Sequence, residues 1–181
     1  MSLPGQMFDH MLNPAKGWPS QAALDFQAKI SPNVQYDMNP GQVAHINTAG
    51  ELEPGVQLGQ MPLFMFQGAN DYDVNAERND QWTPISPTGR VMCLVATGAY
   101  ELETTEFDDT QVYNTNDPLS APIGNSAGSA GVSGVLTNVS PGTLYGGSMK
   151  NRVGVVSRGA FTNCYGKQVI SFWPCYLPGT I

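Results

Sequence analysis

Two β-favouring runs near the end of the chain constrain the fold most strongly. Val153-Gly-Val-Val-Ser-Arg158 and Gln168-Val-Ile-Ser-Phe-Trp173 are rich in β-branched and aromatic residues, and Gly159-Ala-Phe-Thr-Asn-Cys-Tyr-Gly166 connects them. Apolar runs on either side of a connection that contains Gly and Asn are typical of a β-hairpin. The sequence therefore predicts two neighbouring strands close to the C-terminal end.

The composition extends this prediction to the rest of the chain. The 181 residues suit one domain and are enough to bury a core. The chain contains 20 Gly and 14 Pro, and only 13% of its residues are charged. Gly and Pro are the poorest residues in a helix interior, and Asn, Ser and Thr compete for backbone hydrogen bonds. Long helices are therefore disfavoured, and short strands joined by turns are expected.

Further strands follow from local patterns along the chain. They are predicted over Leu24–Ile30, Gln42–Asn47, Pro62–Gln67, Arg90–Ala96 and Ala99–Thr105, and in the last of these Tyr100 and Leu102 share one face while Glu101 and Glu103 share the other. The first alternates apolar and polar residues, although a short helix from Ser20 would also pair its apolar residues four positions apart. Roughly six to nine short strands, with a turn about every 8–12 residues, predict an all-β fold. We expect a small β-sandwich or barrel of short antiparallel strands.

The first 20 residues depart from this pattern. Large apolar residues occur here without a period, between prolines and glycines: Met7, Phe8, Met11, Leu12 and Trp18. Such side chains are not expected to stay in water, so residues 1–20 are predicted to form an extended N-terminal arm that docks on the domain or on a neighbouring subunit. Residues 21–181 are predicted to be a single β domain with a flexible Gly/Ser/Ala loop at 124–134.

Charge and cysteine content limit the classes of function. The net charge is −7, and the 8 Lys and Arg residues form no basic cluster, so direct nucleic-acid binding is not expected. No signal peptide or membrane-spanning stretch is apparent, which predicts synthesis in a cytoplasm and no membrane association. The 3 Cys residues are scattered and lack the short spacing of a zinc site. They are expected to be mostly buried thiols, and whether Cys164 and Cys175 face each other stays open.

Two acidic segments are candidates for a calcium site or a catalytic carboxylate pair. Asp71-Tyr-Asp-Val-Asn75 resembles the start of a calcium loop, but Ala76 occupies the place of the required Gly and Trp82 that of the bidentate Glu. A solvated loop is therefore favoured there. Asp108 and Asp109 follow Glu106, but neighbouring residues on a strand point to opposite faces, which favours a solvated acidic loop over a catalytic pair.

Other chemistry has little support in the sequence. His45 lies in a predicted strand and is expected to be a structural histidine, and the chain has no nucleophile elbow or phosphate-binding loop with a Lys. We therefore predict no catalytic residue, no metal and no cofactor. The Trp and Tyr residues that could form a carbohydrate-stacking platform are dispersed, which favours core and interface packing: Trp18, Trp82, Trp173, Tyr100, Tyr113 and Tyr176.

The order of several segments resembles the small head decoration (cement) proteins of tailed bacteriophages. Asn39-Pro-Gly-Gln-Val-Ala-His-Ile-Asn47 leads into Thr48-Ala-Gly-Glu-Leu-Glu53, and Tyr113-Asn-Thr-Asn-Asp-Pro-Leu119 precedes Val153-Gly-Val-Val-Ser-Arg-Gly159. In that family a Pro-Gly turn, a strand and a Gly-Glu-Leu segment precede an Asp-Pro-Leu turn and a Val-Gly-Val-Val strand. The similarity covers residues 39–119 and 150–179, and its specificity lies in the order of the segments.

The resemblance implies a non-enzymatic virion protein that binds and stabilises the outside of a capsid shell. Its partners would be the major capsid protein and further copies of itself, as a trimer or dimer, and it would assemble in the host cytoplasm. An apolar arm that reaches an adjacent molecule suits this role. The alternatives are a glycan-binding or adhesion module of a phage tail or fibre and, with least support, a small hydrolase that uses Asp108 or His45.

Overall fold

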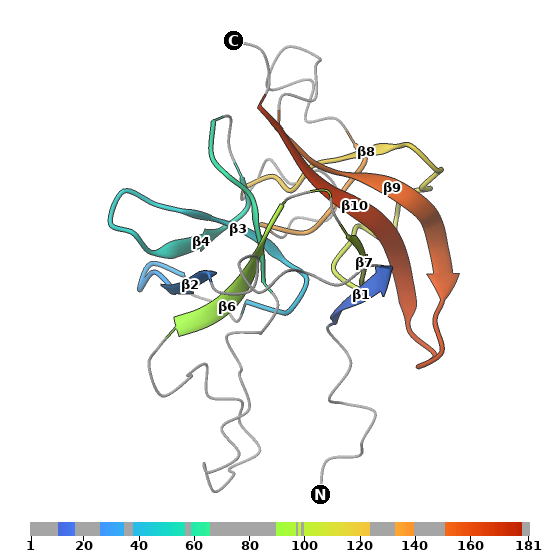
Figure 1. Cartoon of the computed structure of the whole chain (residues 1–181), viewed down its shortest axis with the longest axis horizontal. Helices are drawn as coiled ribbons and strands as arrows, with labels where there is room; N and C mark the ends of the chain where they lie inside the picture. The colour runs from blue at the N-terminus through green and yellow to red at the C-terminus, as the bar shows by residue number, and fades with distance from the viewer. Residues whose placement is uncertain are drawn as a thin grey trace, which may run out of the picture.

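The structure consists of two antiparallel sheets that face each other. The computed structural model describes residues 11–16, 26–34, 38–56, 59–65, 90–96, 98, 100–123, 133–139 and 151–178. Within these ranges every helix or strand assignment is a β-strand, and the strands form two five-stranded sheets (Figure 1). The predicted all-β fold with antiparallel strands is confirmed; of the two predicted arrangements, sandwich or barrel, the two facing sheets form a sandwich, although two strands, with 12 and 11 residues, are longer than expected.

The first sheet contains both the first and the last strand of the chain that the structure describes. Its order is β1-β7-β10-β9-β8, so β1 and β8 are its edges. The strands are β1 (Leu12–Lys16), β7 (Glu101–Thr104), β8 (Pro118–Leu119), β9 (Asn151–Thr162) and β10 (Gln168–Pro178). All of its pairings are antiparallel.

The second sheet is built from the middle of the chain. Its order is β2-β6-β5-β3-β4, with β2 and β4 at the edges. The strands are β2 (Phe26–Lys29), β3 (Val43–Ile46), β4 (Leu52–Pro54), β5 (Leu63–Met65) and β6 (Arg90–Val95). β2, β3, β5 and β6 lie within segments that the sequence predicted as strands, whereas β4 was not predicted as one.

The C-terminal hairpin is longer than its sequence pattern predicts. β9 continues to Thr162, four residues beyond Arg158, so half of the predicted connection is strand (Figure 1). The turn itself is short, and the Asn163 Oδ1 oxygen accepts hydrogen bonds from the backbone N–H groups of Tyr165 and Lys167, both at 3.0 Å. Register shifts along β9 absorb the additional residues, as β-bulges do, and a search for uninterrupted β-favouring runs misses such bulges.

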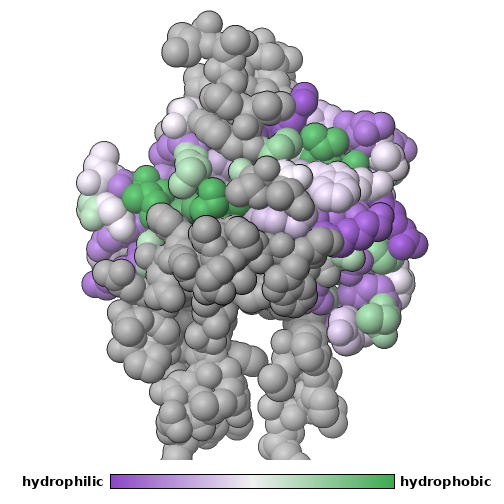
Figure 2. All heavy atoms as spheres, in the orientation of Figure 1, coloured by the Kyte–Doolittle hydropathy of each residue, from purple (hydrophilic) through white to green (hydrophobic). Residues whose placement is uncertain are grey.

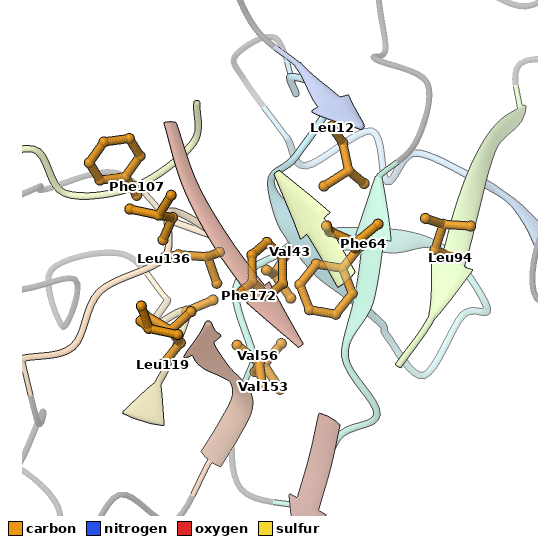
Figure 3. Packing of buried hydrophobic residues seen from close by; sticks show 14 of the residues in the cluster. Leu12, Val43, Val56, Phe64, Leu94, Phe107, Leu119, Leu136, Val153 and Phe172 are labelled. Carbon is orange, nitrogen blue, oxygen red and sulfur yellow. The ribbon is translucent and has the colours of Figure 1, made fainter. Parts of the chain in front are cut away.

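The core lies between the sheets. One buried cluster combines side chains of the first sheet, such as Leu102 and Phe172, with Val43, Phe64 and Leu94 of the second. The rings of Phe64 and Phe172 meet in a tilted arrangement with centroids 5.4 Å apart (Figure 3). Aromatic pairs of this geometry add to the free energy of burial, so this contact joins the two layers.

The second sheet is buried on its other face as well. Alternate residues of its strands enter a second cluster that includes Ala44, Leu63, Met65 and Cys93. Since adjacent strand residues point to opposite faces, Leu63 and Met65 face away from Phe64. Burial on both faces explains why Pro62–Gln67 is a continuous apolar run rather than an alternating one.

A buried turn at Gly134 connects β3 to the segment that contains Pro122. Gly134 has φ +81°, accepts a hydrogen bond from the Val43 N–H at 2.8 Å and donates one to the Pro122 carbonyl at 3.0 Å. A β-carbon at this position would overlap the Val43 carbonyl oxygen. Ser133 and Gly134, which belong to the predicted flexible loop at 124–134, are therefore buried parts of the framework, whereas residues 124–132 lie outside the described residues.

Candidate functional site

A hollow of about 490 Å³ lies on the outer face of the first sheet, the face opposite the core. Its wall comes from β1, β7, β9 and β10 and from the loop before β8. The residues that line it are Ala15, Lys16, Glu101, Glu103, Thr115, Asn116, Val155, Val156, Ser157, Arg158, Ser171 and Trp173. We call this hollow the outer groove. Its volume falls in the range of about 300–1,000 Å³ that is usual for small-molecule sites.

Strand alternation explains why polar residues line the outer groove. Leu102 and Phe172 face the core, so their neighbours Glu101, Glu103 and Ser171 point outward. Glu103 pairs directly with Ser171, and Leu102 with Phe172, across β7 and β10. The sequence pattern, which separated the two glutamates from Tyr100 and Leu102, predicted this division of faces, and the structure confirms it.

Glu101 is the most unusual side chain of the outer groove. It is only 3% exposed although it carries a carboxylate. One carboxylate oxygen accepts a hydrogen bond from the Ser157 hydroxyl. The other oxygen, Oε2, is buried without a hydrogen bond, and the ammonium of Lys16 lies 3.2 Å from it. Because the Lys16 side chain is 75% exposed, this ion pair compensates only a small part of the cost of burying the carboxylate.

A β-bulge brings Ser157 to Glu101. Ser171 pairs with Arg158 and Phe172 with Val156, so Ser157 is an additional residue on β9 without a partner on β10. Bulges bend a strand and redirect a side chain, and they occur often beside functional sites. Close by, Gly159 approaches the Tyr113 carbonyl so closely that a β-carbon would overlap it. The bulged segment is therefore held against the neighbouring loop.

The loop before β8 forms a fixed side of the outer groove. The Asn116 N–H donates to the Val156 carbonyl at 2.8 Å, and the Thr115 hydroxyl donates to the Ser157 carbonyl at 3.3 Å. The Asp117 carboxylate accepts from the Asn114 N–H at 2.8 Å and from the Asn138 side-chain amide at 3.0 Å. These bonds attach the loop to β9 and to itself, which preorganises that wall.

Charges of both signs meet in the outer groove. Lys16 and Arg158 are its cations and Glu101 and Glu103 its carboxylates, so the formal charges cancel. Burial raises the pKa of Glu103, Arg158 opposes this shift and Glu101 adds to it. The Arg158 guanidinium also stacks on the Phe161 ring, 3.7 Å from its centroid, which holds the cation beside the hairpin. The lining is therefore polar but uncharged overall.

The structure describes two of the five candidate arm residues. Met11 and Leu12 are buried in this chain's own domain, and Leu12 begins β1, which pairs with β7. The Met11 N–H donates to the Thr105 hydroxyl at 2.9 Å, and the Met11 sulfur lies 3.3 Å from the Asn163 side-chain amide. Part of the segment predicted as an arm, 12–16, is thus an edge strand. Met7, Phe8 and Trp18 lie outside the described residues.

One of the two neighbouring aspartates, Asp108 and Asp109, has a structural role. Asp109 is exposed, but Asp108 is buried, and its Oδ1 oxygen accepts from the Thr110 N–H at 3.1 Å and from the Thr110 hydroxyl at 2.5 Å. Neither aspartate lies on a strand, so the strand alternation invoked for them does not apply, and the expectation that both are solvated is wrong for Asp108. Its carboxylate orders a turn.

His45 is a buried structural residue, as expected from the sequence. Its Nδ1 atom lies 2.8 Å from the Gly55 carbonyl, and its Nε2 atom lies 4.0 Å from a Glu53 carboxylate oxygen. The ring thereby connects β3 to the end of β4, and it does not line the outer groove.

The described part of the chain contains neither a metal-binding cluster nor a membrane-spanning helix. No group of three or more His, Cys, Asp or Glu residues there is arranged to hold a metal ion. The calcium-like segment Asp71–Asn75 lies outside the described residues. Among the described residues, no helix has the length and apolar character needed to cross a membrane.

The three thiols should differ strongly in reactivity. Burial raises the pKa of Cys93 to about 12, and it also raises the pKa of the half-buried Cys175. Cys164 is exposed in the hairpin turn, whereas Cys175 lies near the other end of β10. Because the thiolate is the reactive form, iodoacetamide at mildly alkaline pH should label Cys164 first and Cys93 only after unfolding. Mass spectrometry of peptides over time checks this order, and early labelling of Cys93 would contradict it.

Comparison with known proteins adds no further constraint. No protein-family model, no curated protein and no solved structure matches the chain.

Proposed function

We propose that this chain is a non-enzymatic structural protein of a tailed-phage virion that binds the outside of the capsid shell. The observation that carries the proposal is the order of the segments that resemble decoration proteins. They extend from the Pro-Gly turn before β3 to the Asp-Pro-Leu segment at β8 and resume at the Val-Gly-Val-Val strand β9. They contribute strands to both sheets, so the likeness concerns the framework and not one loop.

The surface chemistry is compatible with attachment to a protein lattice. Hydrophilic and hydrophobic residues are interspersed over the coloured part of the face in Figure 2. Exposed large apolar side chains occur at separate places, among them Met61, Val112 and Tyr165. Mixed polar and apolar surfaces of this kind are typical of interfaces between proteins that also exist apart. The proposed partners are the major capsid protein and further copies of this chain.

Binding to capsids tests the proposal directly. Purified protein at micromolar concentration should co-sediment in fixed stoichiometry with expanded, undecorated heads of the virus that encodes it, and an image of the decorated head should place it outside the shell. No co-sedimentation at this concentration, or a position on the tail, would overturn the proposal. A tail or fibre position would instead favour the adhesion alternative.

The N-terminal segment gives a sharper version of the same experiment. Because β1 begins at Leu12, a deletion should remove residues 1–10 and leave β1 intact. If Met7 and Phe8 bury apolar surface on a neighbour, at about 25 cal/mol per Å², the deletion should weaken head binding by at least tenfold. The matched control is the double substitution of Met7 and Phe8 by Ser, which should reproduce the loss. Unchanged binding by both variants would remove the arm from the proposal.

A further inference from the structure

We propose that the outer groove is a binding site for an uncharged sugar ring, with Trp173 as the stacking surface and Glu101 as the principal hydrogen-bond acceptor. This role goes beyond capsid attachment and does not depend on it, because a protein held on a shell through another surface can still present this face. The inference rests on the buried carboxylate, the balance of charge and the position of the tryptophan.

The Glu101 carboxylate has an unsatisfied hydrogen-bond acceptor. Glu101 lines the outer groove, and its Oε2 atom is buried and accepts no hydrogen bond. A buried carboxylate oxygen without a donor is costly, and the exposed Lys16 offers it charge without a hydrogen bond. A ligand hydroxyl donates one hydrogen bond without bringing a charge, so it would satisfy this oxygen. The Ser157 hydroxyl, which binds the other oxygen, fixes the direction in which the carboxylate points.

The charges that line the outer groove favour a neutral ligand. The two cations and two carboxylates of the outer groove cancel, so its lining carries no formal net charge that would select an anion or a cation. Acceptors and donors are nevertheless both present, because Ser171 on β10 pairs with Glu103 of β7 on one side and with Arg158 of β9 on the other. A neutral molecule that carries several hydroxyl groups can use both kinds of partner at once.

Trp173 provides an exposed aromatic surface beside the outer groove. Its side chain is 37% exposed although it lies in the middle of β10, and it borders the outer groove beside Val155, its direct partner on β9. A large aromatic ring that remains partly in water next to polar groups provides a flat apolar surface. One face of a pyranose ring presents C–H groups while its edge presents hydroxyls, so the sugar matches an apolar ring with hydrogen-bonding groups beside it.

The site is also largely formed before a ligand binds. The Ser157 bulge and the loop from Asn114 to Asp117 are hydrogen-bonded to each other and to the sheet. Binding therefore requires little ordering of the wall, which favours measurable affinity for a small ligand. A single ring in an open groove is expected to bind weakly, with a dissociation constant on the order of 1 mM.

Nuclear magnetic resonance titration of the full chain tests the inference. The probes are the methyl glycosides of glucose, galactose, mannose and N-acetylglucosamine, and the readout is the indole N–H signal of Trp173, identified by its loss in Trp173→Phe. At least one probe should shift this signal in a saturable way. Glu101→Gln keeps the shape of the side chain but removes its charge, and it should weaken binding by about tenfold or more. Trp173→Ala should weaken binding to a similar extent, followed through backbone signals of β9.

The control variant is Tyr165→Ala, which removes an exposed aromatic ring at the hairpin turn, outside the outer groove. It should bind the sugar as the unaltered protein does, and all variants should keep the same far-ultraviolet circular dichroism. No saturable shift with any of the four glycosides overturns the inference, as does binding that survives both Glu101→Gln and Trp173→Ala. Saturation by the ammonium probe N-acetyl-lysine methyl ester without saturation by any glycoside would assign the groove to a basic peptide and also overturn it. Head binding is measured separately, so failure of one proposal leaves the other intact.

Discussion

Replacing Phe172 by alanine is expected to lower the free energy of unfolding by about 3–5 kcal/mol. The Phe172 ring is fully buried between the sheets and packs against Phe64 with centroids 5.4 Å apart. Its removal would leave a cavity at the point where the two layers meet, and the strands on either side are tied into hydrogen-bonded sheets that limit their collapse. Urea denaturation followed by circular dichroism measures the loss through the linear dependence of stability on denaturant.

The adjacent residue provides the control. Trp173 is larger, but it points to the opposite face of β10 and is partly exposed. Trp173→Ala should therefore cost on the order of 1 kcal/mol, even though it removes more atoms. Equal losses for the two variants would mean that Phe172 does not join the layers as described.

Replacing Gly134 by alanine is expected to cost about 3 kcal/mol or more. Two effects combine at this position. The φ of +81° is unfavourable for a residue with a β-carbon, and that carbon would overlap the Val43 carbonyl oxygen. The same oxygen accepts the Gly55 N–H at 2.8 Å, so relief of the overlap would disturb the link between β3 and the end of β4.

Gly50 separates these two effects. Its φ is +79°, nearly that of Gly134, but a β-carbon there would meet no atom within 4 Å. Gly50→Ala should cost only the backbone strain, about 1 kcal/mol. Thermal and urea unfolding of the two variants measure the difference. If both lose the same stability, the close approach at Gly134 is not the cause, and strain alone explains the result.

The sequence predicted the central strands of the sheets better than it predicted the edge strand β1. Runs such as Gln42–Asn47 and Arg90–Ala96 were recognised because β-branched and apolar residues fill the strands of a buried sheet. β1 was predicted as part of an irregular arm, because Pro14 interrupts it and its apolar residues show no period. Its pairing with β7 depends on a partner far along the chain, which no local pattern contains.

The outer groove could be predicted only in part. Alternation placed Glu101 and Glu103 on one face, and Trp173 was among the aromatic residues considered for stacking. Their convergence was missed, because it depends on the order of β7, β10 and β9 in the sheet and on the bulge at Ser157. A bulge changes the facing of every residue beyond it, so an alternating pattern cannot be extended through it.

The four outermost strands limit further strand addition in different ways. β2 and β4 are linked to each other, because Ile30 bridges Leu52 and the Ser31 N–H donates to the Leu52 carbonyl at 2.9 Å, and the exposed Lys29 ends β2. Pro14 lies within β1, and Pro118 begins β8. A proline offers no N–H to an incoming strand, and a lysine on an edge resists burial against a second sheet. These features should limit edge-to-edge association, so that contacts with neighbouring molecules form through side-chain surfaces.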